Sequence, residues 1–136
     1  MDWKECINKR IVRSAETDDE LIKSLIETSK NTLLSADFLF LNETTSVSKL
    51  SLCYDSLREL LEALALKKGY KIYNHECYTG FLKDIIGDSE LSERFNRIRL
   101  LRNSVNYYGQ KVDLRDAKDK IEELKSLILE IGELID

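Results

Sequence analysis

Residues 89–109 read SELSERFNRIRLLRNSVNYYG, and this stretch decides how the rest of the chain is interpreted. Wound as an α-helix at roughly 100° per residue, it gathers its apolar side chains on one arc: Leu91, Phe95, Ile98, Leu101, Val105 and Tyr108. Arg102 falls inside this arc, and Asn106 lies at its edge, one turn further along. A cation facing the core is costly unless something pairs with it. The sequence therefore predicts either a salt bridge between helices or an anionic ligand at Arg102.

The local charge favours the anionic ligand. Between Arg94 and Lys111 there are five basic residues and no acidic ones, although the whole chain has a formal net charge of −4. One basic segment in an acidic chain is typical of a local binding patch rather than of a general nucleic-acid coat. The nucleic-acid contacts that we predict here are Arg94, Arg97, Arg99 and Tyr108.

The segments on either side of this stretch also carry helical patterns. Apolar residues recur three and four positions apart, which is the spacing of one helix face, and capping residues or glycines mark the ends. The predicted helices span residues 18–41, 47–68, 76–86, 89–109 and 114–135. No segment shows the alternation of a β-strand.

The last of these helices has the most regular pattern. Its apolar residues are separated by alternating steps of three and four: Leu114, Ala117, Ile121, Leu124, Ile128, Ile131 and Ile135. A seam of this length is more typical of a helix in an antiparallel bundle than of an autonomous coiled coil. We therefore predict an all-α fold, an up-and-down helical bundle of four long helices plus one short helix. Residues 1–136 form a single domain, in which residues 1–16 are an N-terminal extension.

The composition limits the kinds of site that the chain can form. With one histidine, His75, and three widely spaced cysteines, Cys6, Cys53 and Cys77, the chain lacks the ligand clusters of a zinc site. We therefore expect no metal and no cofactor, and we interpret the cysteines as buried, reduced side chains of a cytoplasmic protein. No apolar run reaches the roughly 18 residues of a membrane span, so we expect no membrane association. His75 is interpreted as a capping residue at the start of the third helix rather than as a catalytic group.

This arrangement of helices and motifs resembles the HEPN superfamily, the nucleotide-binding domain shared by higher eukaryotes and prokaryotes, in its small stand-alone archaeal and bacterial form. The resemblance covers roughly residues 18–135. It rests on YDSLRELLEALALKKGYKIYNHECYTGFLKDI and on RLLRNSVNYYG. It implies a homodimer in which the motifs of both subunits face one cleft. Active members cleave RNA without a metal, and many members are toxins or partners of a small nucleotidyltransferase.

The family's motif is an arginine, a polar residue and, after a gap of four to six residues, a histidine. Arg102 matches the arginine, Asn103 matches the polar residue, and Tyr107 occupies the histidine position. A register that starts at Arg99 would place Asn106 there instead. The candidate catalytic residues are therefore Arg102, Asn103, Asn106 and Tyr107. Neither register supplies a histidine, and a tyrosine pKa of about 10 makes its hydroxyl a poor base near neutral pH.

Two hypotheses of function remain open. The first is a HEPN-like homodimer that binds RNA or a nucleotide and is a weak or inactivated metal-independent endoribonuclease of toxin–antitoxin type. It predicts an open basic cleft holding Arg102 and Asn106. The second is a non-catalytic interaction module that partners a small nucleotidyltransferase, and it predicts a buried structural salt bridge at Arg102. The dimer is expected to use the helix face that carries Leu100, Asn103 and Tyr107.

Overall fold

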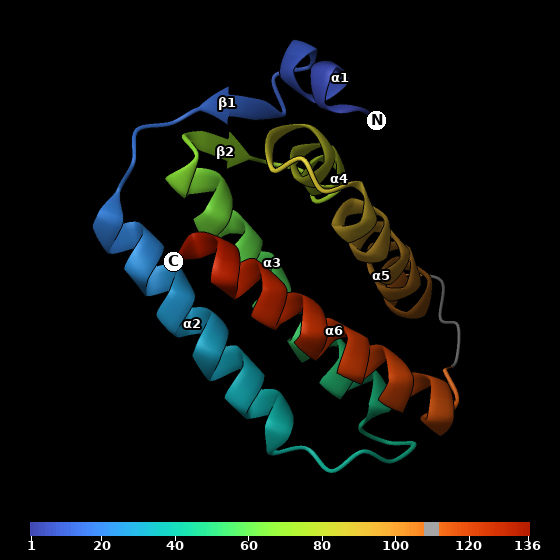
Figure 1. Ribbon diagram of the computed structural model, residues 1–136. Coiled ribbons are helices and arrows are strands. Elements are labelled where there is room, and N and C mark those ends of the chain that lie inside the picture. Colours follow the sequence, from blue (N-terminus) through green and yellow to red (C-terminus); the bar gives the residue numbers. More distant parts are fainter. Residues whose placement is uncertain (108–111) are drawn as a thin grey trace.

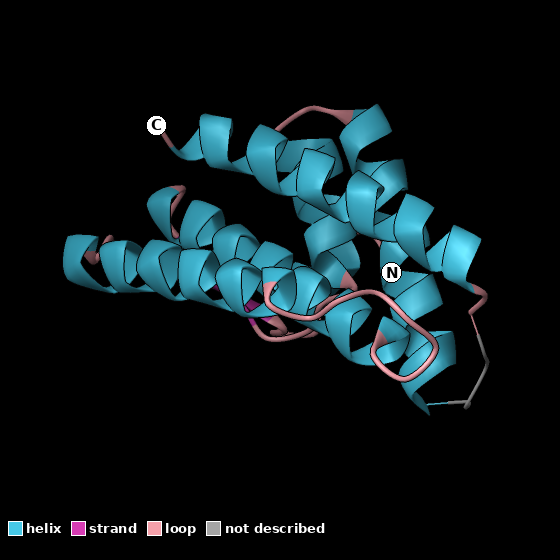
Figure 2. Cartoon of the chain, turned by 90° about the horizontal axis from the view of Figure 1, so that it is seen from below, coloured by secondary structure: helices cyan, strands magenta, loops and turns pink. Residues whose placement is uncertain are grey.

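A computed structural model describes residues 1–107 and 112–136, and the side chains of residues 106 and 107 lie outside its description. The described elements are α1 (Trp3–Asn8), β1 (Val12–Ser14), α2 (Asp19–Asp37), α3 (Ser46–Lys67), β2 (Tyr70–Ile72), α4 (Cys77–Gly80), a π-helical turn η1 (Phe81–Ile85), α5 (Ser89–Tyr107) and α6 (Leu114–Ile135). The chain descends α2, ascends α3, descends α5 and ascends α6 (Figure 1). Seen from below, helices joined by loops dominate (Figure 2). The predicted all-α bundle is confirmed.

The central element is α3, on which both α2 and α6 pack. One face of α3 is buried along its length, as predicted, by Leu50, Cys53, Tyr54, Leu57, Leu60, Leu61 and Leu64. Other sides of the helix are buried as well, at Ser56, Glu59, Ala63, Ala65 and Leu66. The seam predicted for α6 is also buried, because Ala117 through Ile135 face α3 at alternating steps of three and four. Leu114 is the exception at 39% exposure, since it begins the helix where little packs around it.

The arc predicted for α5 is buried where the structure describes it. Leu91, Phe95, Ile98 and Val105 are at most 6% exposed, whereas Tyr108 lies outside the described residues. Asp88 caps the helix, its Oδ1 accepting a hydrogen bond from the Leu91 backbone N–H at 3.0 Å. The basic segment of the sequence is therefore held on a helix with a fixed orientation.

The first long helix is shorter than predicted at its end. It begins after Asp18, whose carboxylate accepts from the Leu21 N–H, and it ends at Asp37 instead of residue 41. The Asn42 side chain accepts from the backbone N–H groups of Thr44 and Thr45 and so organises a loop. Phe40, which continued the apolar pattern, is 89% exposed in this connection.

The predicted third helix is split into α4 and the π-helical turn η1. Gly80 ends α4 against the backbone of α1. A Cβ at this position would lie 2.9 Å from the Trp3 backbone nitrogen, so a glycine is needed for the close approach. The sequence pattern of residues 76–86 shows a helical face but not this change of winding.

The prediction that the chain contains no strand is wrong. β1 and β2 pair antiparallel, with Val12 opposite Ile72, and they lie with α1 and α4 at one end of the bundle (Figure 1). Each strand has three residues, which is too short to show an alternation in the sequence. The N-terminal extension is therefore packed against the bundle, and its Trp3 is buried.

The interpretation of all three cysteines as reduced is also wrong. Cys6 in α1 and Cys77 in α4 form a disulfide with a Cα–Cα distance of 6.1 Å, while Cys53 is free and buried. Reduced cysteines were one reason to expect a cytoplasmic protein, and that reason no longer holds. Among the described residues, no helix is long and apolar enough to cross a membrane.

Candidate functional site

Arg102 projects from α5 onto α3 and makes two contacts there. Its Nη2 lies 3.7 Å from Oδ1 of Asp55, and its guanidinium carbon lies 5.2 Å from the centre of the Tyr54 ring. The side chain is 19% exposed and that of Asp55 is 34% exposed. Arg102 therefore pairs with a carboxylate, as the salt-bridge alternative predicts, but both side chains remain partly exposed to solvent.

Arg99, one turn earlier, is oriented by an amide on its own helix. Its Nε and Nη2 donate to Oδ1 of Asn96 at 3.2 and 2.8 Å, and the Asn96 amide oxygen is also 3.4 Å from the hydroxyl of Thr79. These bonds link the Arg99 guanidinium through Asn96 to α4. Arg99 and Arg102 thus lie on the same side of α5.

The other predicted nucleic-acid contacts do not join them. Arg94 turns to α6, where it donates to Glu130 at 2.6 Å and to the Ser126 hydroxyl at 3.4 Å. Arg97 is exposed, and Tyr108 lies outside the described residues. The four predicted contacts therefore do not form one continuous surface within the described part of the chain.

His75 is brought to Arg99 and Arg102 by the connection between β2 and α4. It does not cap the third helix: Asn74 makes the local turn, its Oδ1 accepting from the Glu76 N–H at 2.9 Å. The His75 Nδ1 instead lies 3.4 Å from the Tyr54 hydroxyl, and its ring is 6.3 Å from that of Tyr78. The capping interpretation of the sequence is wrong.

The charge of Arg58, on α3, also acts on His75 and Tyr54. Burial lowers the pKa of His75, and the positive charges of Arg58, Arg102 and Arg99 lower it further, while Asp55 opposes them. Burial raises the pKa of Tyr54 to about 12 against the same three guanidinium charges. The imidazole is therefore neutral at neutral pH.

We call Arg58, His75, Arg99 and Arg102, with Tyr54 and Asp55, the arginine–histidine cluster. Guanidinium groups offer forked donors that match the oxygens of phosphate, and a neutral imidazole beside them can accept or donate a proton. The cluster can therefore bind an anion and place a proton-transfer group next to it.

The sequence missed Arg58, His75 and Asp55 as site residues. On a helical wheel Arg58 is one turn from Tyr54 on the same face, a signal that marks a shared face but not what packs against it. Asn103 is partly buried on α5. The side chains of Asn106 and Tyr107 lie outside the described residues, so these candidates stay predictions.

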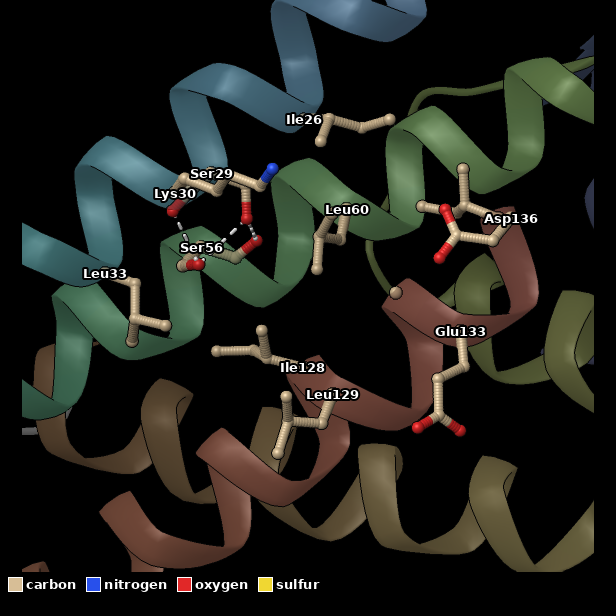
Figure 3. A pocket seen from close by; sticks show the side chains of 12 residues that line it. Ile26, Ser29, Lys30, Leu33, Ser56, Leu60, Ile128, Leu129, Glu133 and Asp136 are labelled. Atoms are coloured by element: carbon tan, nitrogen blue, oxygen red, sulfur yellow. Dashed lines mark hydrogen bonds between the residues drawn. The ribbon is translucent and has the colours of Figure 1, made fainter.

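A second feature lies on the opposite face of α3. A cavity of about 380 Å³ opens between α2, α3 and α6 (Figure 3). Its lining includes Ile26, Leu33, Leu60, Ile128 and Leu129, with Lys30 and Glu133 at its edge. In its wall, where α2 meets α3, the hydroxyls of Ser29 and Ser56 lie 2.9 Å apart and form a hydrogen bond. We call this cavity the α2–α6 groove.

Among the described residues, no three side chains of metal-ligating type gather in one place. Comparison of the chain with family models, curated proteins and solved structures finds no match. Membership of the HEPN superfamily is therefore a proposal.

Proposed function

We propose that this chain is a HEPN-like homodimer that binds RNA or a nucleotide at the arginine–histidine cluster. In this proposal it is a weak or inactivated metal-independent endoribonuclease of toxin–antitoxin type. The observation that carries the proposal is the contact of Arg102, from the motif helix, with Asp55 and with the ring of Tyr54, whose hydroxyl also lies 3.4 Å from His75. Three guanidinium charges beside one carboxylate favour an anion.

Within this proposal, Arg102 clamps a phosphate and stabilises the charge that develops there. Asn103 and Asn106 add neutral hydrogen-bonding groups, and Tyr107 stands at the position of the family's histidine. An unperturbed tyrosine hydroxyl remains protonated near neutral pH and is a poor base. We therefore expect RNA cleavage to be weak or absent, because a tyrosine takes the place of the family's histidine.

Arg102→Ala tests the binding site. We expect the wild type to bind single-stranded RNA with an affinity that falls as salt rises, and Arg102→Ala to bind at least tenfold more weakly. Because the pair with Asp55 is partly exposed, its loss should cost about 1 kcal/mol or less of stability. Arg115→Ala, which removes an exposed arginine from α6, is the matched control.

Tyr107→His tests the catalytic half of the proposal. A gain of RNA cleavage in the presence of a metal chelator would support a ribonuclease scaffold whose base has been replaced. If Arg102→Ala unfolds the protein and the wild type binds no RNA even at low salt, the binding proposal is wrong.

The proposed homodimer uses the outer face of α5. Leu100 is 52% exposed there, and an exposed leucine on a motif helix suits a two-fold contact. Light scattering at micromolar concentration should give twice the 15.8 kDa of one chain. Leu100→Glu should produce monomers, whereas Leu21→Glu, a similarly exposed leucine on α2, should not. A monomeric wild type would contradict the proposed cleft between two subunits.

The second candidate function is a non-catalytic interaction module that partners a small nucleotidyltransferase. It is favoured by the apolar α2–α6 groove and by two exposed aromatic residues after α2, Phe38 and Phe40, at 85% and 89% exposure. If the neighbouring gene encodes such an enzyme, the two purified proteins should associate. Phe38→Ser with Phe40→Ser should then weaken the complex while leaving RNA binding unchanged.

A further inference from the structure

We propose that the α2–α6 groove is a contact surface for a second copy of this chain, in a two-fold arrangement that lays α2 of each copy along α6 of the other. The contact uses helices other than α5, so it goes beyond the proposed homodimer and does not depend on it. Exposed leucines beside the groove supply its apolar part, and opposite charges on the two walls select its orientation.

Two exposed leucines flank the groove, one on each of the helices that form its walls. Leu34 in α2 is 56% exposed, and Leu129 in α6 is 70% exposed. From these positions Leu33 and Ile128 continue the apolar surface into the groove (Figure 3). The apolar surface is therefore wider than the cavity itself, as is typical of a surface that another molecule covers.

The heights of residues along the two walls follow from an ion pair that joins them. Nζ of Lys125 lies 2.6 Å from Oδ1 of Asp37, so these two positions are level. Because α2 and α6 run in opposite directions (Figure 1), each step from Asp37 towards the start of α2 matches a step from Lys125 towards the end of α6. Leu34 is therefore level with Leu129 to within one residue.

The two walls carry opposite net charge. The charged residues are Lys23, Glu27 and Lys30 within residues 23–34 of α2, and Glu130, Glu133 and Asp136 within residues 126–136 of α6. On the α2 wall one positive charge is in excess, and Glu27 lies within one helical turn of both lysines. On the α6 wall Glu130 is paired with Arg94 of α5, which leaves two carboxylates and no basic residue.

Lys30 and Glu133 are the charges closest to the centre of this surface. Both line the groove and are exposed, and neither forms an ion pair within residues 1–107 and 112–136. By the same count of steps, they are level with each other to within one residue. Each is therefore available to a charge of opposite sign at that height on a second copy.

A two-fold axis can relate two such surfaces in two ways. An axis across the helices would lay α2 on α2 and α6 on α6, so that the unpaired carboxylates of α6 would face each other. An axis along the groove lays α2 of each copy over α6 of the other and keeps every residue at its own height. Lys30 then meets Glu133 of the second copy, and Leu34 meets its Leu129. Only this arrangement brings opposite charges together, and symmetry repeats the contact twice.

The contact is small. The surface is two helices wide and about three turns long, roughly 20 Å by 16 Å, which places it at the small end of specific interfaces. The second copy therefore binds weakly, and the mass expected at micromolar concentration remains that of the α5 dimer. A covalent trap records a weak contact of this kind where a mass measurement does not.

Mixing two single-cysteine variants tests the arrangement. Leu34→Cys and Leu129→Cys are each made in a Cys53→Ala background, mixed at high micromolar concentration and oxidised with copper phenanthroline. The mixture should give a disulfide-linked dimer on a gel without thiol, because position 34 of one copy lies against position 129 of the other. Each variant alone should link at least about fivefold less, because its new cysteine lies too far from the same position of a second copy.

Two results would overturn the inference. Linking of Leu34→Cys alone as efficient as that of the mixture would assign the arrangement with α2 on α2. An absence of linking in the mixture would leave the groove to a different protein, as in the interaction-module candidate. Neither result bears on RNA binding at the arginine–histidine cluster, so the proposed function would stand.

Reversal of the two charges is the second measurement. Lys30→Glu in both proteins of the mixture should lower linking about fivefold, because two carboxylates then meet in each contact. Adding Glu133→Lys to both proteins should restore it. Lys83→Glu, which reverses an exposed charge outside the groove, is the matched control, and thermal melting will show that the variants are folded. Linking that is equal in all of these mixtures would overturn the pairing of Lys30 with Glu133 and with it the axis along the groove.

Discussion

His75 is a half-buried imidazole on which several charged side chains act at once. The charges of Arg58 and Asp55 on α3, and of Arg99 and Arg102 on α5, shift its pKa. The Tyr54 and Tyr78 rings flank it at 6.0 and 6.3 Å. Because the chain has one histidine, this residue reports on the electrostatics of the whole cluster without interference.

The pKa of His75 should lie below the ordinary value of about 6.5, first because of burial and then because of the arginine charges. Arg58→Gln should raise it, and Asp55→Asn should lower it further. An NMR titration of the single imidazole measures all three values. Shifts of the same sign in both variants would contradict the arrangement of charges described above.

The same shift makes stability depend on pH. A histidine whose pKa is lower in the folded state binds fewer protons there than in the unfolded chain between the two values. Stability should therefore fall as the pH drops from about 7 through the folded pKa of His75. Urea unfolding at several pH values measures this slope, and His75→Gln should flatten it in that window. An unchanged slope in the variant would assign the effect to other groups.

At the residue scale, the sequence predicts on which face of its helix Arg102 lies, but not which residues of other segments lie near it. Helical periodicity shows that Arg102 lies on the arc of Phe95 and Ile98, because that requires only the geometry of one helix. Asp55, Arg58 and His75 come from segments 27 or more positions earlier in the chain. Their meeting depends on how α3, α5 and the β2–α4 connection pack, which a single helix face does not specify.

At the scale of elements, two glycines in helices have opposite surroundings. Gly80 in α4 faces the Trp3 backbone, where an added Cβ would lie 2.9 Å from the nitrogen, whereas nothing lies within 4 Å of a Cβ added to Gly132 in α6. The first position has no room for a side chain, and the second has no requirement for glycine.

Gly80→Ala should lower the free energy of unfolding by about 1–3 kcal/mol, because α1 must move away from α4. Gly132→Ala should raise it by up to about 1 kcal/mol, because alanine loses less backbone freedom in a helix. Urea unfolding of both variants measures the two effects. A Gly80→Ala protein as stable as the wild type would show that α1 can move away from α4 without lowering the free energy of unfolding.

Elements with long, regular patterns were predictable and short ones were not. The α6 seam follows from spacing alone because its 22 residues repeat one face many times. The strand pair and the π-helical turn each span three to five residues, so no period can be recognised in them. β1 contacts α1, β2 contacts α3, and the π-helical turn contacts α5, so tertiary packing sets these short elements.

At the scale of the whole molecule, the Cys6–Cys77 disulfide joins the N-terminal extension to the bundle across 71 positions of sequence. A covalent link over a loop of this length stabilises by about 4 kcal/mol, mainly by restricting the unfolded chain. The sequence did not reveal the link, because three cysteines without a local motif allow several pairings or none.

Reduction should therefore lower the midpoint of thermal unfolding by several degrees. Melting the wild type with and without a phosphine reductant measures the shift. A Cys6→Ala, Cys77→Ala double variant should melt at the same temperature in both conditions, whereas Cys53→Ala should still respond to the reductant. A wild type insensitive to reduction would show that the link contributes nothing to stability.

The two candidate surfaces lie on opposite faces of α3, because Arg58 and Ser56 are about 160° apart around that helix. A phosphate ligand at the arginine–histidine cluster and a protein in the α2–α6 groove would therefore not compete for space. Both functions could be carried by one molecule at the same time.

The disulfide also spans the exposed connection that follows α2. Phe38 and Phe40 offer accessible cleavage sites there to a protease that cuts after aromatic residues. Cys6 would then belong to the shorter fragment and Cys77 to the longer one. The cut chain would migrate as one band on a denaturing gel without thiol and as two bands once thiol is added.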